Sequence, residues 1–156
     1  MKVYFLILVV LFLLPMGAFA TDCPNFAGSY KWESEDKESF TLLKAEQNGC
    51  TDLKFTYDNG WGFLIVHKHI FDGQKRLVED NGDFQAYETA TINADGIKIF
   101  EERHVKDEEE GGAEDVYFVN FEIFFVPDGR LIIVQKTVRS DGVITDVDKS
   151  EYNRTN

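Results

Sequence analysis

The chain has 156 residues, enough for one domain with a hydrophobic core, and it carries 28 Asp and Glu against 16 Lys and Arg. Its formal net charge of −12 disfavours nucleic acids and anionic membrane surfaces as partners, because both repel an acidic protein. We therefore expect a soluble protein that neither binds nucleic acid nor inserts into a membrane.

The first 20 residues predict a secretory signal peptide. A positive start at Lys2 precedes an apolar run over 3–14 and a small-x-small cleavage site at Ala18 to Ala20. The alternative is a transmembrane anchor, which would need a slightly longer apolar run. A proline and a glycine just before the site favour cleavage. We expect secretion or periplasmic export and one mature domain over 21–156. Its charge is −13, because the leader holds one lysine and no acid.

Turn signals recur along the mature chain. Asn-Gly and Asp-Gly pairs favour tight hairpins, because both central residues of a type I′ turn need positive φ. The chain contains seven such pairs and one Gly-Gly pair: Asn48-Gly49, Asn59-Gly60, Asp72-Gly73, Asn81-Gly82, Asp95-Gly96, Gly111-Gly112, Asp128-Gly129 and Asp141-Gly142. With a polar turn near 34–38, they delimit ten predicted strands: 27–34, 38–47, 50–57, 61–71, 74–79, 84–93, 97–106, 115–126, 130–139 and 143–152.

Alternating residues support the strand prediction. Leu53, Phe55 and Tyr57 share one face of their segment, while polar residues occupy the other. Short turns mean that each strand pairs with the next, and a long meander must close or fold over to bury its apolar face. We therefore predict an all-β fold, a single antiparallel up-and-down meander of about 8–10 strands closed into a barrel. A β-sandwich is the alternative.

The chain has two cysteines, Cys23 and Cys50. Export brings them to an oxidising compartment, so we expect a disulfide, with two free thiols as the alternative. If 27–34 and 38–47 form a hairpin, the two cysteines flank its open end. The disulfide would then fasten that end and stabilise the fold by about 3–4 kcal/mol in the chain-entropy model.

The segment Asn25 to Trp32 resembles the first strand of the calycin barrels, which comprise lipocalins, fatty-acid-binding proteins and avidins. Those families open with a glycine followed two residues later by an aromatic residue. Gly28 and Tyr30 hold these positions here, and Trp32 follows. In such barrels the glycine lets the strand bend and the aromatic ring plugs the floor. The meander is similar to that of fatty-acid-binding proteins, without their helical lid, since 34–38 is only a turn.

His67 and His69 form the first candidate site. On a strand they point to the same face, about 6.5–7 Å apart, which lets two imidazoles reach one metal ion. Neutral imidazole suits zinc or copper; the third ligand would be His104, the only other histidine, or an acidic side chain in its place. The alternative is an ordinary strand wall, since the same face of 61–71 is otherwise apolar. The direction in which this face points decides between the two interpretations.

The acidic run 107–115 is the second candidate. It lacks the ligand spacing of a calcium-binding EF-hand loop, so we expect a solvated loop that would contact a protein partner. Motifs for nucleophilic hydrolysis, phosphate cradling and zinc proteolysis are all missing from the sequence.

We therefore expect a non-enzymatic exported binding protein that holds a small apolar or amphipathic ligand in a barrel lumen, or a protein partner at the rim. The alternatives are zinc binding through His67, His69 and His104, and a structural or inhibitory module acting through loops. Apart from zinc, no cofactor is expected. The candidate ligand-wall residues are Tyr30, Trp32, Trp61, Phe63, Tyr117 and Phe121.

Overall fold

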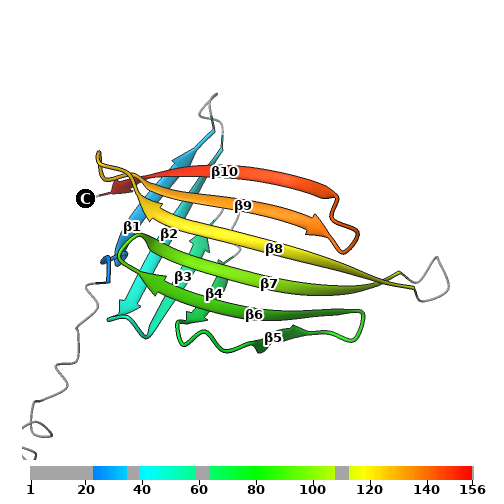
Figure 1. The fold of residues 1–156 in the computed structure, drawn as a ribbon. Coiled ribbons are helices and arrows are strands. Elements are labelled where there is room, and N and C mark those ends of the chain that lie inside the picture. Colours follow the sequence, from blue (N-terminus) through cyan, green and yellow to red (C-terminus); the bar gives the residue numbers. More distant parts are fainter. Residues whose placement is uncertain (1–22, 35–38, 59–63, 108–112, 156) are drawn as a thin grey trace, which may run out of the picture.

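A computed structural model describes residues 23–34, 39–58, 64–107 and 113–155. These residues form one antiparallel sheet, and the all-β prediction is confirmed in the number and order of its strands (Figure 1). The strands are β1 (Gly28–Glu33), β2 (Phe40–Asn48), β3 (Asp52–Asp58), β4 (Leu64–Ile70), β5 (Arg76–Asp80), β6 (Phe84–Asn93), β7 (Gly96–Asp107), β8 (Ala113–Phe125), β9 (Leu131–Arg139) and β10 (Ile144–Thr155). No helix that could cross a membrane occurs in this part of the chain. The predicted signal peptide lies outside the described residues.

The strand order is β4-β3-β2-β1-β10-β9-β8-β7-β6-β5. Every strand pairs with its neighbour in sequence except at one step, between β4 and β5. The first and last strands pair instead, with Ser29–Lys31 beside Asn153–Thr155. In the described residues the sheet is therefore joined at β1–β10 and is not closed by a backbone ladder between β4 and β5. We call this gap, between β4 on one side and β5 and β6 on the other, the seam.

The connection between β4 and β5 explains the interrupted pairing. The Phe71 N–H donates to the Thr51 carbonyl at 2.8 Å, which holds the end of β4 against the β2–β3 turn. The Gly73 N–H donates to the Ala90 carbonyl at 3.1 Å, which directs the chain onto β6. The Asp72-Gly73 turn thus moves the chain from one half of the sheet to the other and does not form a tight hairpin.

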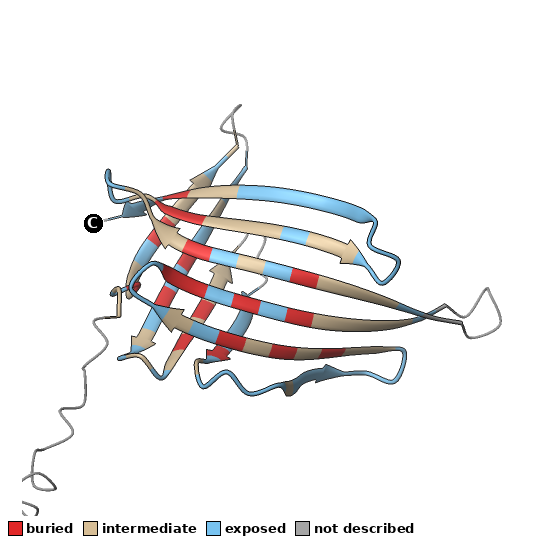
Figure 2. Cartoon of the chain, viewed as in Figure 1, coloured by how far each residue is buried: buried red, intermediate tan, exposed pale blue. Residues whose placement is uncertain are grey.

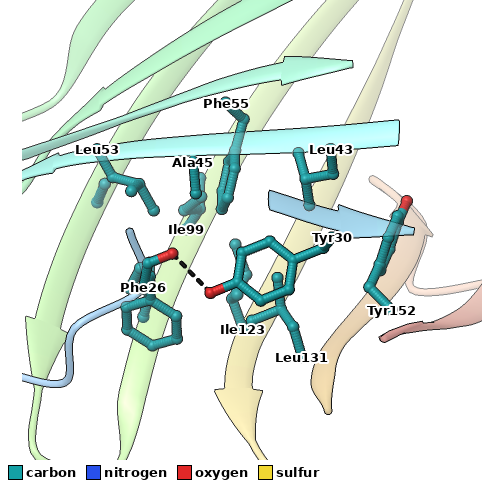
Figure 3. Packing of buried hydrophobic residues seen from close by; sticks show 12 residues of the cluster. Phe26, Tyr30, Leu43, Ala45, Leu53, Phe55, Ile99, Ile123, Leu131 and Tyr152 are labelled. Carbon is teal, nitrogen blue, oxygen red and sulfur yellow. Dashed lines mark hydrogen bonds between the residues drawn. The ribbon is translucent and has the colours of Figure 1, made fainter. Parts of the chain in front are cut away.

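The sheet folds over so that its two halves face each other. Strands β1–β4 run across strands β5–β10 at a steep angle (Figure 1), as in orthogonally packed β-sheets. The core fills the space between the halves on the side where β1 meets β10 (Figure 3). Its largest fully buried side chains are Tyr30, Phe26, Phe55, Leu43, Leu53, Ile97, Leu131, Ile132 and Val119.

Tyr30 anchors this core from β1. Its ring is fully buried, and its hydroxyl donates to the Phe26 carbonyl at 2.8 Å (Figure 3). Phe26 in turn stacks on Phe125 with ring centroids 4.9 Å apart. Gly28 lies against this group, and a Cβ there would come within 3.3 Å of the Tyr30 hydroxyl. The two residues that carry the calycin resemblance therefore act together to pack the core.

The predicted disulfide is confirmed. Cys23 and Cys50 are bonded, with Cα atoms 5.7 Å apart. β1 and β2 form the expected hairpin, with Gly28 opposite Ala45 and Glu33 opposite Phe40. The disulfide ties the segment before β1 to the turn that follows β2, as the sequence predicts.

Candidate ligand cavity

A cavity of about 310 Å³ lies between the two halves of the sheet, within the size range of small-molecule sites. Residues of β3, β4, β7, β8, β9 and β10 line it: Phe55, Tyr57, His67, His69, Ile99, Glu101, Arg103, Phe121, Ile123, Ile133, Gln135, Asp148, Ser150 and Tyr152. A second cavity of about 600 Å³ lies at the seam and shares four of these residues, His67, His69, Glu101 and Arg103. These four side chains therefore separate the interior from the seam.

One wall of the interior cavity is apolar. Phe55 and Ile99 are fully buried, and Phe121 packs half-buried beside them. Tyr57 and Tyr152 add hydroxyl groups to this wall. Burial raises the pKa of both tyrosines, and their mutual proximity raises that of Tyr57 further. Both hydroxyls therefore remain neutral hydrogen-bonding groups near pH 7.

The polar part of the lining begins at β4, the strand beside β3, where His69 is buried and His67 lies at the exposed border of the cavity. His67 and His69 stack nearly parallel, with centroids 6.3 Å apart and an interplanar angle of 6°. His69 meets Phe55 edge-on at 5.9 Å, and His67 meets Tyr57 edge-on at 6.0 Å. The apolar face expected for this strand is therefore the face that borders the cavity.

His69 also links the two sides of the seam. Its Nδ1 lies 2.7 Å from Glu88 Oε2 on β6, and both side chains are only 8% exposed. A buried polar pair of this kind is stable only when its hydrogen-bonding groups are satisfied. Among the described residues, every buried side-chain polar atom has a partner. Because β4 and β6 share no backbone ladder, this pair supplies a direct polar link between them.

Arg103 and Glu101 form an ion pair on β7. Arg103 donates from Nε and Nη2 to Glu101 Oε2, at 2.8 and 2.6 Å. Glu101 is largely buried, whereas Arg103 is one-third exposed. Asp148 on β10 also borders the interior cavity and accepts a hydrogen bond from Ser150 Oγ at 3.3 Å. The polar wall thus carries two carboxylates and one arginine that is already paired.

His104 lies on the other face of the sheet. Ile97 and Ile99 on the same strand are in the core, so the alternation of a strand places His104 outside. Its Nε2 lies 2.8 Å from Glu102 Oε1. Hydrogen bonds from Lys75 and His104 lower the pKa of Glu102. This group is an outer-surface cluster, separate from the cavity.

The structure therefore does not place His104 beside His67 and His69, the other two candidate zinc ligands. The cause is strand parity, which turns two of them inward and one outward. Within the described ranges, no group of three or more His, Cys, Asp or Glu side chains is arranged to hold a metal ion.

The other expected site residues are distributed unevenly. Phe121 lines the cavity. Tyr30 is in the core, and Trp32 packs half-buried against the core. Tyr117 is on the Phe121 face of β8, four residues nearer the β7–β8 turn, and its hydroxyl lies 3.4 Å from Asp115. Trp61 and Phe63 lie outside the described residues, as do 108–112 of the acidic run; β7 and β8 form the flanks of that run.

The sequence analysis missed most of the lining, including four charged residues: Glu88, Glu101, Arg103 and Asp148. A signal for three of them was present. Glu88 alternates with Ala86 and Ala90, and Glu101 and Arg103 continue the face of Ile97 and Ile99. A charge on the apolar face of a strand is costly without a partner, so it marks an interior polar site.

The strand order is that of an up-and-down antiparallel β protein, as the calycin resemblance implies, and a partly open cavity lies between its two halves. No family model and no curated protein matches the sequence. Among solved structures, the chain is similar to a crystal structure of a mutant of the fluorescent protein UnaG. The TM-score is 0.49 at 13% sequence identity, covering 84% of this chain and 96% of that one.

Proposed function

We propose that this protein is an exported binding protein that holds a small amphipathic molecule in the interior cavity. The observation that carries the proposal is the two-sided lining of the cavity. Phe55, Ile99 and Phe121 offer an apolar surface, while His67 and Arg103 lie on the polar side. A mostly apolar pocket with a few placed polar groups is the usual form of a small-molecule site.

Export is supported by two independent features. The Cys23–Cys50 disulfide indicates an oxidising environment, because thiols stay reduced in the cytosol. The sequence of residues 1–20 predicts a signal peptide cleaved after Ala20. Both features support a secreted or periplasmic protein.

Binding is tested by titrating the purified mature protein with the neutral apolar dye Nile red. We expect saturable dye fluorescence that falls on replacing Gln135 by tryptophan, because the indole would fill the cavity. Val134→Trp is the matched control, because Val134 is the neighbour of Gln135 on β9, points to the outer face and does not line the cavity. Equal binding by Gln135→Trp and Val134→Trp, with both folded by circular dichroism, would place the dye outside the cavity and contradict the proposal.

A further inference from the structure

The charges around the two cavities are unbalanced. Two fixed cations and four carboxylates line them: Lys68, Arg103, Glu79, Glu88, Glu101 and Asp148. The two histidines can each add positive charge only when protonated. The surroundings add to this imbalance, since the mature chain carries a net charge of −13. A cavity lined in this way attracts cations and repels anions.

Both fixed cations are already engaged. Arg103 donates through two nitrogens to Glu101, as described above. Lys68 Nζ lies 3.8 Å from Asp52 Oδ1, which is not a cavity residue. The carboxylate of a fatty acid would therefore have to displace Glu101 from Arg103 while lying near a second acid. This arrangement is unfavourable for an anionic headgroup.

Of the two carboxylates on the interior cavity, Asp148, an exposed residue at its border, is the one that is not held in an ion pair. In the described part of the chain its one side-chain hydrogen bond comes from Ser150 Oγ, and no Lys, Arg or His lies within ion-pair distance. Tyr152 lies close enough that the Asp148 charge contributes to raising the pKa of its phenol, after burial. Tyr57 and Phe121 supply further aromatic rings on the same cavity. Aromatic faces beside a carboxylate are favourable surroundings for an ammonium group.

We infer that the ligand of this cavity is an amphipathic organic cation, an amine with an apolar body, and not a fatty acid. The inference rests on the proposed function. The ammonium group would pair with Asp148 beside the rings of Tyr57 and Tyr152, and the apolar body would lie against Phe55, Ile99 and Phe121. The Arg103–Glu101 pair would remain closed.

The test is isothermal titration calorimetry at pH 7.5 with three ligands of one chain length: decylamine, decanol and decanoate. We expect decylamine to bind about two- to fivefold more tightly than decanol, as an ion pair with an exposed carboxylate provides, with decanoate weakest. Asp148→Asn should remove most of the preference of decylamine over decanol. Glu122→Gln is the matched control, since it removes one negative charge from the outer face of β8, where Glu122 lies 3.7 Å from Lys98.

A third variant tests the role assigned to the ion pair. Glu101→Gln releases Arg103, so decanoate should gain affinity relative to decylamine. Decanol binding without a preference for decylamine would overturn the inference and leave the proposed function intact. So would a preference that Asp148→Asn leaves unchanged. Absence of binding by all three ligands would overturn the proposed function as well.

Discussion

The two places where the halves of the sheet meet are built differently. At β1–β10 a backbone ladder joins the strands, and the core around Tyr30 packs directly against it. At the seam, β4 is exposed at every residue except His69 (Figure 2), and the His69–Glu88 pair bridges to β6. A ladder backed by a core is rigid, whereas an edge strand with few buried contacts opens locally at low cost. The difference indicates that the stability of the fold is concentrated on one side and that adaptability lies beside the cavity.

The largest effect is expected at the β1–β10 junction. Tyr30→Ala should lower the free energy of unfolding by about 3–5 kcal/mol, as deletion of a fully buried aromatic ring does. Ile65→Ala on β4 removes a side chain that is half exposed and should change it by less than about 0.5 kcal/mol. Urea denaturation measures both values. Equal losses would mean that the two sides contribute alike.

The disulfide strengthens the same side. Replacing Cys23 and Cys50 together by serine should cost about 3 kcal/mol, because the loop it closes spans 27 residues in sequence. Thermal unfolding of the double variant, compared with the wild type under non-reducing conditions, checks this value. A loss well below about 1 kcal/mol would show that the β1–β2 hairpin holds its open end without the covalent link.

At the seam the expected cost is smaller and local. His69→Ala leaves Glu88 buried without its partner, which should cost about 1–3 kcal/mol. Amide hydrogen exchange should accelerate in β4 and remain slow in β1 and β10. Uniform acceleration across the sheet would show that the pair supports the whole fold. Glu88→Gln, which keeps a hydrogen-bonding group in place, should restore part of the protection that Glu88→Ala loses.

The buried tyrosines of the cavity should make the free energy of unfolding depend on pH in the alkaline range. Burial raises the folded-state pKa of Tyr57 and Tyr152 above the ordinary value of about 10. The folded protein then binds more protons than the unfolded chain above that pH, so the free energy of unfolding falls as pH rises through and beyond 10. Tyr57→Phe should weaken this dependence, whereas Tyr87→Phe on the outer face serves as the control. Urea midpoints between pH 8 and 11 measure it.

Much of the fold could be predicted because its signals are local. The glycine of each turn pair reports a backbone requirement at that position, and Gly49 and Gly129 do adopt positive φ, 54° and 86°. The Cys23–Cys50 disulfide followed from one hairpin and its register. The interrupted pairing was missed because Asp72-Gly73 has the composition of a hairpin turn. Only hydrogen bonds to distant Thr51 and Ala90 reveal its different role.

The site was harder to predict because its members come from six strands. The alternation of side chains along a strand would have separated His104 from the other two histidines. Ile97 and Ile99 mark the inward face of their strand, and His104, an odd number of residues away from both, lies on the other face. The partnership of His69 with Glu88 crosses a gap that no local pattern marks. The pairing of Arg103 with Glu101 is local in sequence, but its importance depends on the cavity that both side chains border.

The smallest effect is expected at a second His–Glu pair, which isolates the role of burial. His104–Glu102 has nearly the same length as His69–Glu88, 2.8 against 2.7 Å, but its side chains are about one-quarter exposed. Glu102→Gln should therefore change the free energy of unfolding at pH 7 by less than about 0.5 kcal/mol. The pKa of Glu102 is lowered by Lys75 and His104, so its contribution is present above the ordinary glutamate pKa and is lost as pH falls through the folded value. A loss as large as that of His69→Ala would show that exposure does not distinguish the two pairs, and the special role of the seam pair would fail.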